Sequence, residues 1–563
     1  MSLTFSISLL LSLLLSLITV PLIAVTAPAP SPSVECKSTL YPKLCRSILS
    51  TFRSSPSDPY DYGRFSVKQC LKQAQKTSYL IDRYLTHNNQ RSSLSHVEAG
   101  ALDDCRQLSD LTTDYLETIS TELKSADSLT DELVDRIQTL LSAIVTNQQT
   151  CFDGLQDSGS SMISALYAPF SNATELYSVS LGLVTQALNR RLHRRRNRNK
   201  PSPAQEERFL TDVTRFWPHR GSGWPKKTSV INGRNLGQVT EGGILVNGTV
   251  TVTKDGSGNF TTIGDAIAFA PNNSMVEDGY FVIYLKEGLY EEYVLVAKNK
   301  KNIMLLGDGI NRTVITGNRS VIDGWTTFNS ATVAVSGERF VGIDITFKNT
   351  AGPEKHQAVA VRNNADLSTF YRCSFEGYQD TLYVHSLRQF YRECDVYGTV
   401  DFIFGNSASV FQNCNLFARK PMPDQKNAFT AQGRTDPNQN TGISIHNCTV
   451  RPAPDLALDL NSTRNYLGRP WKDYSRTVYM QSFIDSLIEP VGWLEWNGTA
   501  GLSTLYYGEF ENYGPGANTS LRVQWPGYSL MNASQASNFT VYNFTMGDTW
   551  LPYTDIPFSG GLL

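Results

Sequence analysis

A repeat of about twenty residues, found in a strand-rich region, most strongly limits the folds open to this chain. It is marked by a cysteine in residues 370–373 (FYRC), 390–394 (FYREC) and 410–414 (VFQNC). Repeats of this length are typical of solenoids, in which each repeat adds one coil. Parallel strands stack ~4.8 Å apart, so equivalent positions in successive coils become neighbours in space. The repeat therefore favours a parallel β-helix over a sandwich.

Two aspartates occupy equivalent positions in the first two of these repeats. Asp380 lies seven residues after Cys373, and Asp401 lies seven residues after Cys394. A single aspartate in a loop is most often a turn former, but the matched offsets predict two carboxyl groups side by side. Two such groups do not both ionise easily, so one tends to keep its proton. An acid beside a nucleophile or base indicates an enzyme.

The chain divides into a helical part and a strand-rich part. Residues 35–188 contain few glycines and place apolar residues at three- and four-residue steps, as in 95–123 and 129–155. This pattern predicts an all-α four-helix bundle. From residue 249 onward, short β-branched and aromatic runs alternate with polar and glycine-containing turns, and one helix is expected over 263–269. A length of 563 residues also favours two domains.

The N-terminus has the features of a secretory signal. Residues 7–23 are apolar apart from serines, a threonine and a proline, and the following residues 25–27 (VTA) suit signal peptidase. We predict a signal peptide over 1–27, and an uncleaved anchor helix is the competing interpretation. The remaining chain is rich in Asn-x-Ser/Thr glycosylation acceptors, which fits secretion. They begin at Asn172, Asn247, Asn259, Asn272, Asn311, Asn318, Asn447, Asn461, Asn497, Asn518, Asn532, Asn538 and Asn543.

Residues 189–248 are predicted to form a linker with a basic cluster. The cluster consists of Arg190, Arg191, Arg194, Arg195, Arg196, Arg198 and Lys200. Exposed basic residues between two folded units invite a processing protease, and a solvated, uncut spacer is the alternative. Nucleic-acid binding is disfavoured behind a secretory signal, and residues 249–563 carry 30 acidic against 24 basic residues. None of the nine cysteines has a C-x-x-C spacing, so no structural metal is expected.

Five motifs of the strand-rich part, in family order, resemble those of pectin methylesterase, a plant cell-wall carbohydrate esterase. They are residues 288–292 (GLYEE), 357–360 (QAVA), 379–381 (QDT), 401–405 (DFIFG) and 467–471 (LGRPW). The resemblance implies a right-handed parallel β-helix over 249–550, followed by a C-terminal tail over 551–563. It also implies a pectinesterase, a carboxylic ester hydrolase that converts methyl esters of pectin, or polygalacturonate, into free carboxylate and methanol. No cofactor is expected.

The helical part resembles the pectin methylesterase inhibitor domain that many plant members carry as a pro-region. This resemblance implies that residues 30–188 inhibit or chaperone the catalytic part, and that disulfides join Cys36 to Cys45 and Cys105 to Cys151. Residues 190–193 (RRLH) are similar to the basic processing site of the family except at the last position. We therefore expect pectin and a subtilisin-like processing protease as partners, and secretion to the cell wall, or apoplast.

The resemblance also assigns catalytic roles. Asp401 is the expected nucleophile of an aspartyl acyl-enzyme, and Asp380 is the expected general acid and then base. Arg469 can hold Asp401 ionised through a charge-assisted contact, whereas Asp380, beside that negative charge, should have a raised pKa. Gln379 carries amide donors and is placed as the donor to the oxyanion that forms on the ester carbonyl.

Three further residues are carried over as substrate-binding. Gln357 is placed beside the oxyanion, Trp471 offers a flat apolar face to a sugar ring, and Thr327 belongs to a TTFNSAT stretch that the family places near substrate. Structural alternatives are an internal polar ladder for Gln357, a core position for Trp471 and a surface ion pair for Arg469.

The cysteines of the repeat predict a disulfide between coils, because neighbouring strands fit disulfide distances. We expect Cys394–Cys414, and Cys373–Cys394 together with Cys414–Cys448 is the alternative.

Two other functions compete with the esterase. A lyase or glycosidase built on the same fold would shorten the polymer without releasing methanol. A wall-binding protein with a silent site, or a free inhibitor module, would release no methanol at all.

Overall fold

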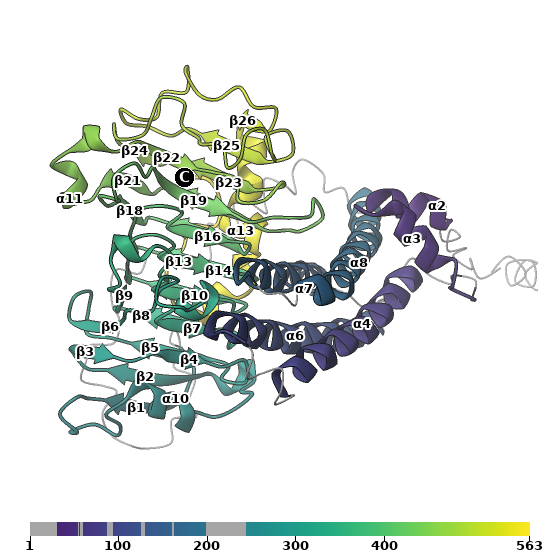
Figure 1. Ribbon diagram of the computed structural model, residues 1–563, viewed down its shortest axis with the longest axis horizontal. Coiled ribbons are helices and arrows are strands. Elements are labelled where there is room, and N and C mark those ends of the chain that lie inside the picture. Colours follow the sequence, from purple (N-terminus) through teal and green to yellow (C-terminus); the bar gives the residue numbers. More distant parts are fainter. Residues whose placement is uncertain are drawn as a thin grey trace, which may run out of the picture.

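The computed structural model describes residues 31–54, 56, 60–86, 94–124, 130–159, 163–198 and 244–563. These residues form a helical part and a larger β-helix that lie against each other (Figure 1). The predicted signal segment 1–27 and residues 199–243 of the predicted linker lie outside the described residues. Within the described ranges, no helix is long and apolar enough to cross a lipid bilayer.

The predicted four-helix bundle is confirmed. Its long helices are α4 (Asp61–Thr86), α6 (His96–Glu122), α7 (Asp131–Asp157) and α8 (Ile163–Arg198). A short N-terminal hairpin precedes them and consists of α2 (Pro32–Glu35), η1 (Cys36–Ser38) and α3 (Pro42–Leu49). Because α8 extends to Arg198, residues 189–198 are helical, although the sequence placed them in the linker.

The local sequence explains where α6 begins. The Ser95 hydroxyl accepts a hydrogen bond from the Glu98 amide at 3.2 Å, and the Glu98 carboxylate accepts one from the Ser95 amide at 2.8 Å. This reciprocal capping box satisfies two amide groups that the first turn of a helix leaves unpaired.

The two disulfides that the family resemblance implied are both present. Cys36–Cys45 closes the N-terminal hairpin, and Cys105–Cys151 joins α6 to α7. Cross-links of this kind stabilise a fold mainly by restricting the unfolded chain.

The strand-rich part is a parallel β-helix, and its strands form three sheets. The first sheet contains β1 (Val246–Val252), β2 (Tyr280–Leu285), β5 (Ile303–Leu306), β8 (Val341–Ile343), β11 (Ser368–Tyr371), β14 (Arg388–Arg392), β17 (Ala408–Gln412), β20 (Gly442–His446), β23 (Arg476–Met480), β25 (Tyr506–Phe510) and β26 (Tyr528–Leu530). The second sheet contains β22 (Asn465–Gly468), β19 (Asn427–Gln432), β16 (Ile403–Gly405), β13 (Leu382–Val384), β10 (Val361–Asn363), β7 (Val333–Val335) and β4 (Val294–Val296). The third sheet contains β24 (Phe483–Ile484), β21 (Thr449–Pro452), β18 (Asn415–Ala418), β15 (Asp395–Gly398), β12 (Ser374–Glu376), β9 (Thr346–Asn349), β6 (Thr313–Gly317) and β3 (Gly288–Glu291).

The predicted repeat sets the register of these sheets. Phe370 pairs with Tyr391, and Tyr391 pairs with Phe411, in three successive strands of the first sheet. Their rings stack inside the β-helix, with interplanar angles of 3° and 5° and centroid distances of 5.3 and 4.4 Å. Each repeat therefore adds one coil, and the coils share a continuous apolar interior.

The predicted disulfide between coils is not formed. Cys373, Cys394, Cys414 and Cys448 are all buried as free thiols, so the expected Cys394–Cys414 bridge was wrong in this structure, and so was its alternative. In-register strands point these side chains in the same direction, and each thiol instead bonds to backbone carbonyls. The Cys394 thiol lies 3.4 Å from the Phe370 carbonyl, and the Cys414 thiol lies 3.4 Å from that of Tyr391.

Short elements complete the two ends of the β-helix. The helix expected over 263–269 is α10 (Ile263–Phe269). The C-terminal elements are α12 (Ala533–Ala536), η7 (Ser537–Phe539), α13 (Val541–Thr545), η8 (Gly547–Thr549) and η9 (Leu551–Thr554). Leu551 and Ile556 are buried in the apolar cluster outside the first sheet, so residues placed in a tail pack as part of the fold. Strand β1 begins at Val246, three residues before the expected start at 249.

The remaining short elements lie in the turns of the β-helix. They are η3 (Val276–Asp278), η4 (Phe328–Ser330), η5 (Pro353–Lys355), α11 (Pro454–Ala457) and η6 (Leu460–Ser462).

The helical bundle packs on the outer face of the second sheet, where α6 and α7 reach the middle coils (Figure 1). One apolar cluster spans the contact. Its members from the bundle include Leu102, Leu108, Cys151, Leu155 and Phe170, and those from the β-helix include Phe328, Val359, Tyr383, Phe404 and Ala431. The two parts therefore share a buried apolar contact, whose burial is the main force that holds such parts together.

Replacing Phe370 by alanine should destabilise the protein strongly, because the side chain is fully buried and stacks on Tyr391. Loss of a buried phenylalanine costs about 3–5 kcal/mol. We expect a clearly lower midpoint when the full chain is unfolded in guanidinium and followed by circular dichroism. Leu458→Ala, at a position that is 89% exposed, is the control and should change the free energy of unfolding by less than about 0.5 kcal/mol. Equal effects of the two substitutions would contradict the role given to the stacked interior.

Candidate active site

Asp380 and Asp401 lie at equivalent bends of neighbouring coils, directly before β13 and β16. Both adopt the left-handed backbone conformation, with φ of 63° and 54°, which aspartate tolerates better than most residues. The Asp380 amide donates to the Val400 carbonyl at 3.0 Å, and Leu382 pairs with Ile403 in the strands that follow. Coil stacking therefore brings the two aspartates together, as their matched positions in the repeat predicted.

Arg469 contacts one of the two carboxyl groups. It follows β22, and its Nε and Nη2 atoms each donate to a different oxygen of Asp401 at 2.7 Å. Such a bidentate, charge-assisted pair fixes the orientation of the carboxylate as well as its charge. Asp401 is 5% exposed and Asp380 is 8% exposed, so both groups are largely removed from water.

The two carboxyl groups differ in their surroundings. Burial raises the pKa of Asp380 well above its ordinary value, and the neighbouring charge of Asp401 raises it further. Burial also raises the pKa of Asp401, but the hydrogen bonds and positive charge of Arg469 oppose that increase. Asp380 is thus the group that holds a proton more readily, and Asp401 is the group that ionises first.

Two of the other predicted site residues lie beside this pair. Gln379 precedes Asp380, and its buried Oε1 atom has no hydrogen-bond partner among the described residues. The Ala358 amide donates to the Gln379 carbonyl at 3.2 Å, so Gln357 lies on the adjacent coil next to Gln379. The side-chain amide of Gln379 is therefore not committed to a structural bond.

Trp471 and Thr327 lie elsewhere, at the contact with the helical bundle. Trp471 is partly buried against the apolar cluster shared by the two parts, and its ring centroid lies 6.0 Å from that of Phe404. Thr327 precedes η4, in a segment whose Thr326 hydroxyl donates to Asp104 of α6 at 2.5 Å. The structure therefore separates these two residues from the open part of the site.

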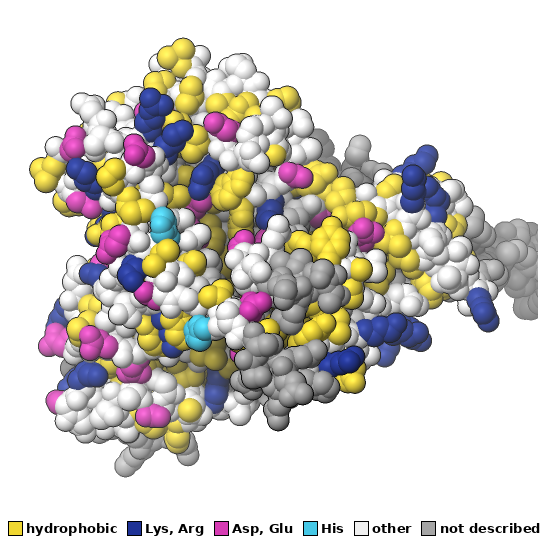
Figure 2. Space-filling view, in the orientation of Figure 1, with side chains coloured by type: hydrophobic (Ala, Val, Ile, Leu, Met, Phe, Trp, Pro, Cys, Tyr) yellow, Lys and Arg dark blue, Asp and Glu magenta, His cyan; other side chains and the backbone are white. Residues whose placement is uncertain are grey.

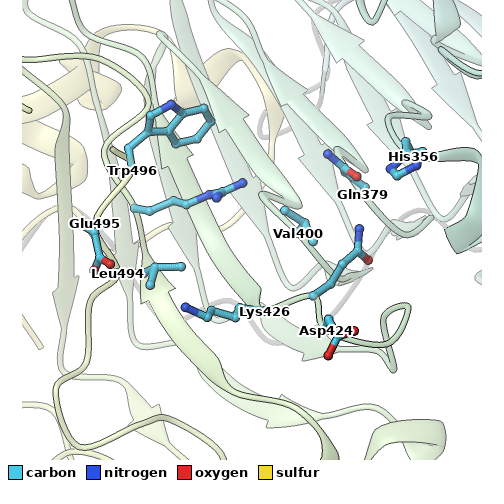
Figure 3. Close-up of a pocket in the computed structure, with 10 residues that line it drawn as sticks. His356, Gln379, Val400, Asp424, Lys426, Leu494, Glu495 and Trp496 are labelled. Carbon is cyan, nitrogen blue, oxygen red and sulfur yellow. The ribbon is translucent and has the colours of Figure 1, made fainter. Parts of the chain in front are cut away.

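A pocket of about 440 Å³ opens beside the aspartates. Its lining residues are His356, Gln379, Val400, Asp424, Gln425, Lys426, Arg469, Leu494, Glu495 and Trp496. Trp496, Leu494 and Lys426 lie on one side and Gln379 and His356 on the other, with Val400 between them (Figure 3). A small ligand in this pocket would meet both the Gln379 amide and the Arg469 guanidinium.

Trp496 is a site residue that the sequence did not reveal. Its ring lies 4.4 Å from the Arg469 guanidinium and is 39% exposed, so it can support Arg469 and still face a ligand. Trp496 follows β24 in an irregular segment outside the cysteine-marked repeat. The only signal in the sequence that could have indicated a site residue here is an aromatic side chain next to the acidic Glu495.

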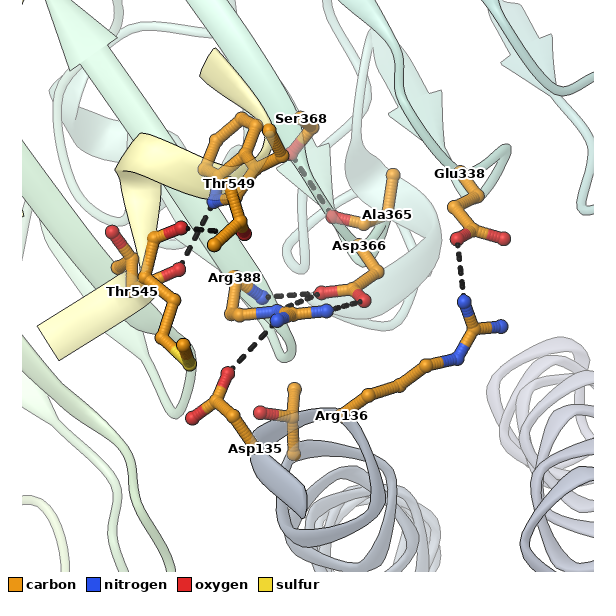
Figure 4. Close-up of polar contacts among 12 residues, drawn as sticks. Asp135, Arg136, Glu338, Ala365, Asp366, Ser368, Arg388, Thr545 and Thr549 are labelled. Atoms are coloured by element: carbon orange, nitrogen blue, oxygen red, sulfur yellow. Dashed lines mark hydrogen bonds and ion pairs between the residues drawn. The ribbon is translucent and has the colours of Figure 1, made fainter. Parts of the chain in front are cut away.

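Polar contacts also join the bundle to the β-helix. Arg388 bonds through Nη2 to Asp366 at 2.7 Å and through Nη1 to Asp135 of α7 at 2.8 Å, and Arg136 of α7 bonds to Glu338 at 3.3 Å (Figure 4). The Arg388 side chain is only 5% exposed. An ion pair as buried as this one makes removal of either partner costly.

Acidic and basic side chains are interspersed over the β-helix face seen in Figure 2. Within the part of the chain that the structure describes, no group of three or more His, Cys, Asp or Glu side chains could hold a metal ion.

Comparison with protein families agrees with this architecture. A family model described as pectinesterase matches residues 249–548, and one described as plant invertase/pectin methylesterase inhibitor matches residues 33–183. The chain therefore belongs to the pectinesterase family, and its helical part is an inhibitor-like domain.

Two relatives from Arabidopsis thaliana share both parts. Probable pectinesterase/pectinesterase inhibitor 25 is 61% identical over 539 residues, which cover 95% of this chain and 87% of the relative. Probable pectinesterase/pectinesterase inhibitor 47 is 61% identical over 544 residues, which cover 94% of this chain and 86% of the relative. Among solved structures, the pectin methylesterase from carrot is 54% identical, with a TM-score of 0.55, and the match covers 56% of this chain and 98% of that chain.

Replacing Arg469 by glutamine should raise the pKa of Asp401, because the two bonds that favour the ionised carboxylate are lost. An arginine beside an aspartate typically lowers its pKa by about 1–3 units. We expect the acid limb of kcat/KM for methanol release to move toward higher pH by a shift of that order. Arg469→Lys, which keeps the charge without the bidentate fork, should show a smaller shift. An unchanged acid limb in both variants would contradict the electrostatic role of Arg469.

Proposed function

We propose that this pectinesterase hydrolyses the methyl esters of pectin through a covalent intermediate on Asp401. The observation that carries the proposal is the bidentate contact of Arg469 with Asp401, beside an Asp380 whose pKa is raised by burial and by that neighbouring charge. One carboxylate is thereby available as a nucleophile at a pH at which its neighbour is still an acid.

The first half of the reaction forms the intermediate. An Asp401 oxygen attacks the ester carbonyl, and the carbonyl oxygen takes the negative charge. When the carbonyl re-forms, the bond to methoxide breaks, and Asp380 gives its proton to the departing oxygen. Methanol leaves, the sugar is joined to Asp401 through an acyl bond, and Asp380 is left ionised.

The second half restores the enzyme. Asp380, now a carboxylate, takes a proton from a water molecule while the water oxygen attacks the acyl carbon. The acyl bond to Asp401 breaks, which releases the galacturonic acid group and returns Asp401 to its ionised form; the released acid then loses its proton to solvent and becomes the free carboxylate. Asp380 again holds a proton, so one water is consumed for each methanol released.

Gln379 is the proposed donor to the negative oxygen. Its amide faces the pocket and is not held by another side chain, and Gln357 lies on the next coil to assist. Removal of one such donor typically costs ~10²–10³ in rate. Trp471 and Thr327 are proposed to bind the polymer, and Trp496 adds an aromatic face at the pocket.

The helical domain is proposed to inhibit the catalytic part until the chain is processed in the basic segment by a subtilisin-like protease. The support is its position, because it packs on the second sheet and buries Tyr383 and Phe404 close to the aspartates. We further propose that the chain is secreted and acts in the cell wall, where its polymeric substrate lies.

Replacing Asp401 by asparagine should reduce methanol release from methyl-esterified pectin by at least about 10³, because the amide lacks the nucleophilic charge. Methanol and free carboxylate are measured together, so that ester hydrolysis is separated from cleavage of the polymer. Asp455→Asn, outside the pocket, is the matched control and should keep the activity of the unchanged chain. Normal activity of the Asp401 variant would rule out the proposed nucleophile, and shortening of the polymer without methanol would indicate a lyase or glycosidase.

Separating the two parts should increase activity on pectin. Residues 244–563, which include all of β1, are expected to release methanol from pectin faster than the full chain at equal concentration. Adding residues 31–198 in excess should lower that rate again. A rate that is unaffected by the helical domain, attached or added, would argue for a folding role rather than an inhibitory one.

A further inference from the structure

The helical bundle covers one of two surface regions of the β-helix near the aspartates and leaves the other open. The first region is an aromatic shelf on the outer face of the second sheet, which consists of Phe328, Tyr383, Phe404 and Trp471. The first three residues are fully buried and Trp471 is partly buried, all in the apolar cluster shared with the bundle. Leu102 of α6 and Cys151 of α7 belong to the same cluster. The shelf is thus covered by the bundle.

Polar contacts hold α7 over the shelf. The Thr150 hydroxyl lies 3.0 Å from Nε2 of His385, the residue directly after β13. Asp153 pairs with Lys472 at 2.8 Å, directly next to Trp471. With the ion pair between Asp135 and Arg388, these contacts extend along most of α7.

The second region is the pocket beside the aspartates, and it remains open. All ten residues that line it belong to the β-helix, and they include Gln379 and Arg469. Its volume of about 440 Å³ suits a small ligand rather than a polymer. Tyr383 follows Asp380 by three residues, so the covered shelf begins only about 10 Å along the strand from the catalytic bend.

We infer that the uncut chain hydrolyses small methyl esters at this pocket while it excludes the pectin polymer. The inference rests on the proposed function and concerns the same reaction, in which one water is consumed and one methanol is released. A single methyl galacturonate unit can enter the open pocket, which is lined by Gln379, the residue before Asp380, and by Arg469, which bonds to Asp401. A longer chain must also lie on the shelf, where α6 and α7 already pack, so the bundle discriminates between substrates by length.

The test compares two substrates on the full chain: methyl-esterified pectin and the methyl ester of galacturonic acid. The variant combines Asp135→Lys and Asp153→Lys, which sets like charges against Arg388 and Lys472 and changes only the bundle. We expect kcat/KM for pectin to rise at least tenfold, while kcat/KM for the small ester stays within twofold. Asp82→Lys, on the exposed side of α4, is the charge-reversal control and should change neither value.

A second measurement uses the unchanged chain, so that the test does not depend on folding of the variant. Methyl-esterified oligomers of increasing length are compared at equal ester concentration. An open cleft favours longer substrates, because they gain binding energy from additional sugar rings. For the covered cleft we expect methanol release per ester to fall as the oligomers lengthen.

The outcomes separate this inference from the proposed function. Equal rises for both substrates in the Asp135 and Asp153 variant, or faster release from longer oligomers in the unchanged chain, overturn the inference and leave the esterase intact. An absence of methanol from every substrate in every variant overturns the proposed function and the inference with it.

Discussion

The stacking of one coil on the next at Asp380 and Asp401 is the contact on which the whole site depends. The amide of Asp380 bonds to the carbonyl of Val400, and the strands that follow stay in register. Two buried carboxyl groups would move apart if they could, because each raises the energy of the other in its ionised form. The backbone ladder prevents this separation. The proximity that the chemistry requires is therefore maintained by main-chain bonds and not by the acidic side chains themselves.

Arg469 gives two identical side chains different behaviour. It comes from a later part of the chain than either aspartate, and it bonds to Asp401. In a symmetrical pair the two carboxyl groups would hold the shared proton equally. A cation beside one group lowers the pKa of that group, so the proton stays on the other. Trp496 packs on the same guanidinium. An irregular segment near the C-terminal end of the β-helix therefore helps to hold Arg469 against Asp401.

The repeat and the motifs located the fold and the aspartate pair because coil length is nearly constant between Cys373 and Cys414. That regularity ends soon afterwards, since Cys448 follows Cys414 by 34 residues. Trp496 therefore has no position that a period could reveal. The expected Cys394–Cys414 bridge failed for another reason, because spacing between strands predicts distance but not the direction of the thiols. The docking of α6 and α7 depends on two complementary surfaces. The sequence pattern of either part alone does not predict which surface of the other part it contacts.

The contacts between the bundle and the shelf are noncovalent, so the effect of cleaving the chain depends on how tightly the two halves bind each other. While both parts share one polypeptide, each bundle meets its own β-helix at an effective concentration set by the connecting residues, and dilution has no effect on it. After a cut, the same contacts become an equilibrium between two molecules. Cleavage would make the association of the bundle with the β-helix bimolecular. The fraction of free enzyme would then depend on the concentrations of the two halves in the surrounding medium.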